Sequence, residues 1–421
     1  MTKRELELYI HIPFCERKCA YCDFLSFPSV EAERERYVAR LIQEIKSYQG
    51  NFDSYEVRSI FIGGGTPSIL RGSLVVDIMV ACGDTFTMKE DAEITIECNP
   101  GSVTEEKAKA WKEAGINRVS IGLQSTSNQE LQELGRIHNY EDFLRTYQLL
   151  RSVGFHNINV DLISGIPGQT LEQYERSVQA ICELDPQPEH ISAYGLIVEQ
   201  GTPYGDRYLD QEGNILNNFT SCEESSKAKV NQNGFEQNMP LPLPDEDTDQ
   251  SMYDRTAELL SEYGYHRYEI SNYALAGYEC LHNVGYWQRV EYIGLGLGAS
   301  SLIGNCRLKQ TEDMQEYMDR DFCSGIHEIE TMLQYNTIKS FEKLSQKDEI
   351  EEYIMLGLRM MKGISNTTCI ETYGYSFMDE CKNQILALQD MGLVSVDHEW
   401  LRLTEKGIRV SNYVIAEMLA V

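Results

Sequence analysis

Hydrophobic and polar positions follow a repeating strand-then-helix order through the first half of the chain. Residues 6–12 alternate as a strand does, and residues 32–48 space their apolar side chains as a helix does. The order recurs with strands over 57–62, 93–97, 117–123, 157–163 and 190–198, and with helices over 68–80, 104–114, 140–153 and 171–184. Strands that are joined by helices must be parallel. The pattern therefore predicts an α/β fold, with a partial (β/α)6 barrel over residues 1–200 whose site lies at the carboxyl ends of its strands.

The alternation stops after Gly201-Thr202-Pro203. Residues 206–247 are rich in Asn, Glu, Ser and Pro, which indicates an excursion over the surface. A helix is expected at 248–263, followed by an aromatic stretch. We therefore expect residues 201–345 to form an extension that packs on the barrel.

The pattern changes again near residue 346. Helices are predicted at 349–361, 367–373 and 377–391, and short strands at 393–396 and 401–403. Three helices and a hairpin resemble a winged-helix module, so residues 346–421 are expected to form a C-terminal helical, winged-helix-like domain. The segment has no basic recognition face, and it therefore does not predict DNA binding.

Composition narrows the classes of function. Lys and Arg number 37 against 66 Asp and Glu, and the resulting formal charge of −29 disfavours nucleic acid as a partner. The same charge counts against an enzyme that modifies RNA. No signal-peptide layout or membrane-length apolar run is present in the sequence, so we expect a cytoplasmic protein. In that compartment the 12 cysteines are expected to be thiols or metal ligands.

Three cysteines directly follow the first predicted strand. Cys15, Cys19 and Cys22 have the spacing C-x3-C-x2-C. Three thiolates can occupy three irons of a [4Fe–4S] cluster and leave the fourth iron open. The alternatives are a zinc site, which would need a fourth Cys or His nearby, and three unrelated core cysteines. No second C-x2-C pair follows, so the sequence favours the cluster.

The cysteine motif and its surroundings resemble the radical S-adenosylmethionine (SAM) enzymes. In those enzymes the amino and carboxylate groups of SAM chelate the open iron. Gly63-Gly64-Gly65-Thr66-Pro67 follows the second predicted strand, where glycines let backbone approach a ligand closely. A glycine-rich turn alone would indicate only a structural turn, but together with the cysteines it supports a cofactor loop.

Further segments narrow the resemblance. Residues 9–15, 63–67, 96–100, 120–125 and 159–167 are similar to the oxygen-independent coproporphyrinogen III oxidase superfamily. The resemblance implies that the SAM contacts are Tyr9, Tyr21, Gly64, Gly65, Thr66, Glu97, Gln124, Arg136 and Asp161. Glu97 and Asp161 follow strands as acceptors for amino or hydroxyl groups, and Arg136 can pair with a carboxylate. Taken singly, each of these three charged side chains would be interpreted as a solvated surface charge or as a partner in a hydrogen bond of the core.

Two features separate the branches of this superfamily. Coproporphyrinogen dehydrogenases resemble C-x3-C-x2-C-x-C, whereas Phe24 stands at the last position here. Only 14 residues precede Cys15, so we expect no long leading segment over the site. Both features count against porphyrinogen decarboxylation.

A third feature is the segment from Cys280 to Trp287, which resembles the H-N-x-x-Y-W motif of the HemW family of heme chaperones. The motif residues are His282, Asn283, Tyr286 and Trp287. An imidazole beside an amide and two aromatic rings can supply an iron ligand and a flat apolar surface. The ordinary alternatives are a buried, hydrogen-bonded histidine and, for Cys280, a buried thiol. Those chaperones usually carry Gly-Ala-His-Ser, and Ser300 stands here in place of that histidine, a candidate ligand.

The resemblance implies a heme chaperone that binds a [4Fe–4S] cluster, SAM and heme. It further implies transfer of heme to apo-hemoproteins such as respiratory cytochromes, and a homodimer whose state depends on the cofactors. The alternative is a catalytic radical SAM enzyme that acts on a porphyrinogen, such as an oxygen-independent coproporphyrinogen III oxidase. The sequence leaves both open, because binding SAM and splitting it use the same residues.

Overall fold

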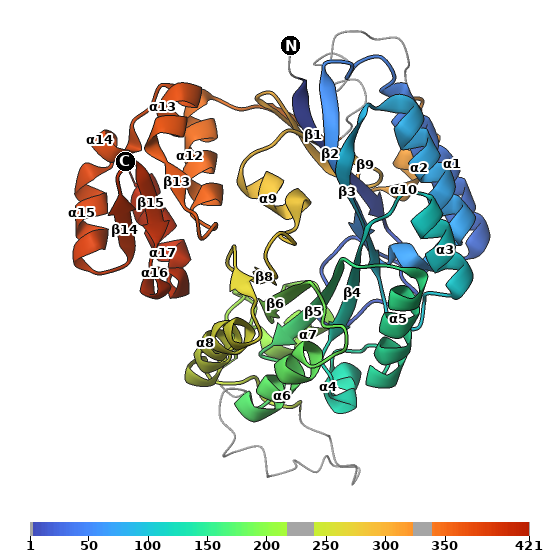
Figure 1. The fold of residues 1–421 in the computed structure, drawn as a ribbon, viewed down its shortest axis with the longest axis horizontal. Coiled ribbons are helices and arrows are strands. Elements are labelled where there is room, and N and C mark those ends of the chain that lie inside the picture. Colours follow the sequence, from blue (N-terminus) through green and yellow to red (C-terminus); the bar gives the residue numbers. More distant parts are fainter. Residues whose placement is uncertain (1–2, 217–239, 323–338, 421) are drawn as a thin grey trace.

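The computed structural model describes residues 3–216, 240–322 and 339–420. Six parallel strands pair in chain order and form the centre of the main sheet, which is not closed (Figure 1). They are β1 (Arg4–Ile12), β2 (Tyr55–Gly64), β3 (Met88–Cys98), β4 (Arg118–Gln124), β5 (Ile158–Ser164) and β6 (His190–Gly195). The predicted α/β fold with a partial barrel of six strands is confirmed.

Helices cover the outer side of this sheet (Figure 1). They include α1 (Glu31–Ser47), α2 (Gly72–Thr85), α3 (Glu105–Glu113), α5 (Tyr140–Val153), α6 (Leu171–Cys182) and α8 (Glu246–Glu262), with the short α4 (Asn128–Glu133) and α7 (Pro203–Tyr208). Alternate strand residues such as Leu8 and Ile10 are fully buried in the core with Leu41 and Ile45 of α1. Burying these apolar faces is the main stabilising term for this layer. In the described ranges, no helix is both long and apolar enough to cross a membrane.

Some predicted bounds differ from the structure. The helix expected at 68–80 begins only at Gly72, because the short 3-10 turn η1 (Pro67–Ile69) comes first and Arg71 has extended backbone. The strand expected at 190–198 ends at Gly195. The helix expected at 377–391 is divided at Cys381 into α14 (Phe377–Glu380) and α15 (Lys382–Asp390).

The chain beyond residue 200 lengthens the sheet at both edges. Beside β6 lie β8 (Asn272–Ala274) and β7 (His266–Arg267). Beside β1 lie β9 (Tyr292–Leu295), parallel to it, and then β10 (Ser300–Ile303), β11 (Cys306–Lys309) and β12 (Ser340–Lys343), with α10 (Met314–Asp319) after β11. Helix α9 (Leu281–Trp287) joins the two edges across the concave side of the sheet (Figure 1). Residues 217–239 of the predicted surface excursion lie outside the described residues.

The C-terminal region has its own sheet and core. The antiparallel sheet has the order β13 (Ile364–Ser365), β15 (Trp400–Leu403) and β14 (Val394–Asp397). Around it pack α12 (Gln346–Gly357), α13 (Asn366–Tyr373), α14, α15, α16 (Glu405–Arg409) and α17 (Ser411–Leu419). Leu358, Phe377 and Leu401 are fully buried in this second core. The expected helical, winged-helix-like region is present, while the boundaries at residues 200 and 345 stay predictions.

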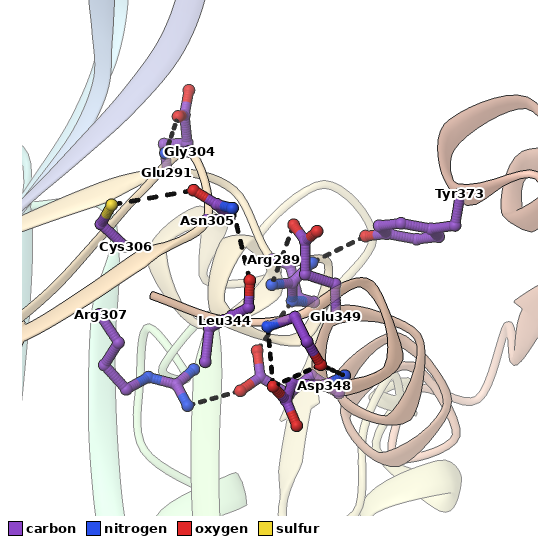
Figure 2. A network of polar contacts seen from close by, with 12 residues as sticks. Arg289, Glu291, Gly304, Asn305, Cys306, Arg307, Leu344, Asp348, Glu349 and Tyr373 are labelled. Carbon is purple, nitrogen blue, oxygen red and sulfur yellow. Dashed lines mark hydrogen bonds and ion pairs between the residues drawn. The ribbon is translucent and has the colours of Figure 1, made fainter. Parts of the chain in front are cut away.

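A polar network joins this region to the turn after α9 (Figure 2). Arg289, which has a positive φ of 56°, donates to Glu352 Oε2 at 3.0 Å and to the Tyr373 hydroxyl at 2.8 Å. Arg307 of β11 pairs with the other oxygen of Glu352 at 2.5 Å. The Glu352 carboxylate of α12 therefore binds two arginines, one in the turn between α9 and β9 and one in β11. These contacts fix the C-terminal region against the end of α9.

Candidate functional site

The three cysteines of the motif lie in a loop that begins directly after β1. The amide of Cys15 donates to Phe27 O at 3.1 Å and the amide of Phe27 donates to Pro13 O at 3.0 Å, so the loop is closed at its base. Cys15 is buried, whereas Cys19 and Cys22 are partly exposed. The loop therefore has a fixed base and presents its later cysteines toward the carboxyl edge of the sheet.

The glycine-rich turn after β2 packs directly on this loop. The amide of Thr66 donates to Phe14 O at 2.7 Å, and its hydroxyl lies 3.3 Å from Cys15 Sγ. A Cβ on Gly64, whose φ is 111°, would lie 2.5 Å from the His11 ring, and one on Gly65 would lie 2.7 Å from Phe14 O. Glycine is required at both positions because the turn approaches the end of β1 at Gly64 and the start of the cysteine loop at Gly65 too closely for a side chain.

Two carboxyl groups lie on β3 and β5, the strands on either side of β4. Glu97 of β3 accepts the amide of Gly64 at 3.1 Å, and Asp161 of β5 accepts the Asn159 amide at 2.8 Å. Burial, and then the charge of Asp161, raises the pKa of Glu97 to about 8. Burial also raises the pKa of Asp161. Both carboxyl groups are thus desolvated, and both line the same pocket.

Arg136 and Gln124 complete the site from the far side. Arg136 donates to Cys19 Sγ at 3.5 Å and to Asn99 Oδ1 at 2.6 Å, and it also bonds Gly122 O. Gln124 ends β4 with a positive φ of 77°, a strained conformation of the kind that gathers at functional sites. Asn99 was not among the residues predicted from the sequence. It also donates to Thr66 Oγ1 at 2.9 Å, and so it links the glycine-rich turn to Arg136. The sequence signal that could have identified Asn99 as a site residue is its position directly after Glu97-Cys98, at the end of a predicted strand.

The predicted cluster and SAM residues, except Tyr9, meet in one pocket of about 130 Å³ at the carboxyl ends of the strands. Its lining includes Cys15, Cys19, Cys22, Tyr21, Gly64, Gly65, Thr66, Glu97, Gln124, Arg136 and Asp161. Tyr9 lies instead in an adjoining cavity, which shares Gly64, Glu97 and Asp161 with the pocket. Over the described ranges, no three His, Cys, Asp or Glu side chains are grouped to hold a single metal ion. Three separated thiols around a pocket suit a cluster, in which each iron takes its own thiolate.

His282 is placed inside the molecule rather than at a surface. It is 1% exposed, its Nδ1 lies 2.9 Å from Ser59 Oγ, and its ring stacks on Phe61 with centroids 5.3 Å apart. Its Nε2 has no hydrogen-bond partner among the described residues. Burial, with the charges of Arg118 and Arg58, lowers the pKa of this imidazole to about 3. The ring is therefore neutral, and it is closed to solvent in this structure.

Two acidic residues of the sheet, Glu93 and Glu7, lie against α9. Glu93 of β3 accepts the amides of Leu281 at 3.1 Å and His282 at 3.3 Å, and the thiol of Cys280 at 3.4 Å. A Cβ on Gly285 would lie 1.9 Å from Oε1 of Glu7 in β1. The glycine inside the H-N-x-x-Y-W motif is therefore needed for the helix to pack on the sheet.

The other motif residues face two directions. Asn283 and Tyr286 line the cavity that contains Tyr9. Trp287 packs with Tyr268 and Met360, and its indole lies under the Arg359 guanidinium at 5.6 Å. Ser300 starts β10 opposite Lys309. The motif therefore does not form one surface in this structure, and its part in binding heme stays a prediction.

Comparisons with known proteins agree with this architecture. Residues 9–181 match the model of the radical SAM superfamily, and residues 344–410 match the HemN C-terminal domain. The solved structure of coproporphyrinogen III oxidase (HemN) from Escherichia coli is similar, with a TM-score of 0.78 and 21% identity over 100% of this chain and 91% of that one. At that identity the likeness shows the fold alone.

Relatives of known family show the family to which this chain belongs. The heme chaperone HemW of Lactococcus lactis is 31% identical over 100% of this chain and 98% of its own length. The heme chaperone HemW of Bacillus subtilis is 32% identical over 98% of each chain, and that of Escherichia coli is 36% identical over 70% of this chain and 69% of its own. This chain belongs to the HemW family of the radical SAM superfamily.

Proposed function

We propose that this chain is a heme chaperone that holds a [4Fe–4S] cluster and SAM, binds heme, and transfers the heme to apo-hemoproteins. The observation that carries the cofactor part is the single pocket that contains Cys15, Cys19 and Cys22 together with the implied SAM contacts. The heme part rests on membership of the HemW family.

The pocket residues have distinct roles in this proposal. Cys15, Cys19 and Cys22 would hold the cluster through their thiolates, and the cluster would supply an iron to which SAM can bind. Glu97 and Asp161 accept hydrogen bonds from amino or hydroxyl groups, and the Arg136 guanidinium pairs with a carboxylate. Thr66 and Asn99 hold the glycine turn beside the cysteine loop.

For heme, α9 is the candidate element. Asn283 and Tyr286 already face a cavity, whereas His282 binds Ser59 and its backbone binds Glu93. Binding of heme iron by His282 therefore requires α9 to leave Glu93, and we propose that heme is taken up in such an opened state. A second copy of the chain is the proposed oligomeric partner, and respiratory cytochromes are the proposed acceptors.

One observation favours the alternative, a catalytic radical SAM enzyme. The pocket adjoins a cavity that contains Tyr9, Glu97 and Asp161, where a substrate could lie beside SAM. Its activity would be the oxidative decarboxylation of a porphyrinogen propionate.

Two measurements on the anaerobically reconstituted chain separate these functions. Hemin titration, followed by the Soret band, should give stoichiometric binding that weakens in His282→Ala but not in His156→Ala, an exposed histidine. Incubation with coproporphyrinogen III, SAM and reductant should give no turnover. Several decarboxylations per cluster, or no hemin binding, would overturn the chaperone proposal.

A further inference from the structure

A cavity of about 310 Å³ lies on the concave side of the sheet. It lies between α9 and the pocket that contains Cys15, Cys19 and Cys22, which we call the SAM pocket. Arg118, Asn159 and Ser192 form part of its wall, and Asn283 and Tyr286 of α9 close it from the opposite side. Gly64, Glu97 and Asp161 line both this cavity and the SAM pocket, so the two spaces are continuous. None of the roles described above uses Arg118.

Arg118 is a buried cation without a dedicated partner. It is 2% exposed, and its Nε has no hydrogen-bond partner among the described residues. Glu93 and Asp161 act on it through their charge, but Glu93 is bonded to the amides of α9, and Asp161 accepts from Asn159 and Ser120. A buried guanidinium N–H that lacks an acceptor is costly, which indicates that something else fills the cavity beside it.

We propose that Arg118 binds the carboxylate of an organic acid inside this cavity. The guanidinium presents two parallel N–H groups that fit the two oxygens of a carboxylate, a geometry that a lysine cannot reproduce. Glu97 and Asp161, which the proposed function assigns to SAM, mark the end of the cavity that meets the SAM pocket. The ligand is therefore a compact organic acid, or the acidic side arm of a larger molecule.

The cavity can be filled from outside. Phe24, which is 70% exposed, and Tyr194, which is 40% exposed, also line it, so part of its wall reaches solvent. Two sources of the carboxylate fit this opening. One is a free organic acid, and the other is the propionate arm of a bound heme, which rests on the proposed function.

The test uses the anaerobically reconstituted full chain and three probes: glycolate, hemin, and hemin dimethyl ester, whose propionates are blocked. Each is titrated against wild type, Arg118→Gln, Arg118→Lys and the control Arg145→Gln, an exposed arginine on α5. Arg118→Gln should weaken binding of an acidic probe by about tenfold or more, and Arg145→Gln should not. If Arg118→Gln does not fold, Arg118→Lys replaces it in the test. Lysine keeps the positive charge but lacks the two parallel N–H groups, so binding of an acidic probe should still weaken.

The outcomes separate the sources and the two proposals. Loss of glycolate affinity identifies a free acid, whereas loss of hemin affinity with no effect on the dimethyl ester identifies a propionate. If wild type binds glycolate through Arg118 but binds no hemin, the proposed function fails and this site remains. If every acidic probe binds wild type and the Arg118 variants equally, or none binds wild type, Arg118 is only a counter-ion and the inference is wrong.

Discussion

Glu7 gives a quantitative prediction about stability and pH. It is fully buried on the concave side of β1 under α9, and its carboxyl group faces Ser59 and the guanidinium of Arg58. Burial raises the pKa of this carboxyl to about 9, although Arg58 Nε lies 3.5 Å away and lowers it. The folded protein therefore keeps a proton on Glu7 that the unfolded chain releases above its ordinary pKa of 4.5.

The sign follows from this difference in bound protons. Because the folded-state pKa lies above the unfolded value, the contribution to stability is full below pH 4.5 and is lost as pH rises toward 9. Within that window the free energy of unfolding should fall by about 1.4 kcal/mol per pH unit from this one group. Glu7→Gln keeps the shape and removes the titration, so between pH 6 and pH 8 its stability should fall about 3 kcal/mol less than that of wild type.

The assay is urea unfolding at pH 6, 7 and 8, followed by circular dichroism, on wild type, Glu7→Gln and Glu5→Gln. Glu5 lies on the same strand, but its carboxyl is partly exposed and its pKa is lowered by Lys89, so Glu5→Gln should not reduce the fall in stability between pH 6 and pH 8. Equal pH slopes for wild type and Glu7→Gln would refute the reasoning, because Glu7 would then be ionised in the folded state.

Three further changes test other parts of the structure. Gly285→Ala places a methyl group against Glu7 and should lower the melting temperature and displace α9, which proteolysis near residue 281 would detect; an unchanged melting temperature would show that the site has room. Arg289→Ala leaves Glu352 with Arg307 as its partner and should cost about 1.5–3 kcal/mol of unfolding free energy in urea, whereas a loss as small as that of Arg145→Gln would contradict a structural role for the network. Cys19→Ser should abolish iron binding after reconstitution, while Cys182→Ser, a buried cysteine of α6, should keep it; equal iron contents would exclude the cluster assignment.

The central strands could be predicted because each strand–helix unit carries its own periodic pattern. Strands β9, β10 and β11 have only four residues each, too few for a period, and β9 finds its partner β1 far away in the sequence. The division at Cys381 could not be predicted either, because the apolar spacing continues across it.

The cofactor pocket could be predicted largely because its residues follow the carboxyl ends of successive parallel strands. Arg118 was missed because it begins its strand, where a charge normally faces solvent, whereas groups from far along the chain, Tyr268 and Cys280, lie close to it in the structure. The buried state of His282 was one of the two readings that the sequence left open. It depends on Ser59 and Glu93 from two separate strands, which no local pattern reveals.

Direct transfer of heme is the most direct test of the chaperone proposal. The reconstituted chain is loaded with heme and mixed with an apo-cytochrome, and the Soret band of the acceptor is followed over a range of acceptor concentrations. The same loaded chain is mixed with apomyoglobin, which captures heme that dissociates freely. A chaperone should transfer heme faster than it loses heme to apomyoglobin, at a rate that rises with the cytochrome concentration. Transfer at the rate of free dissociation, independent of the acceptor, would contradict the proposed function.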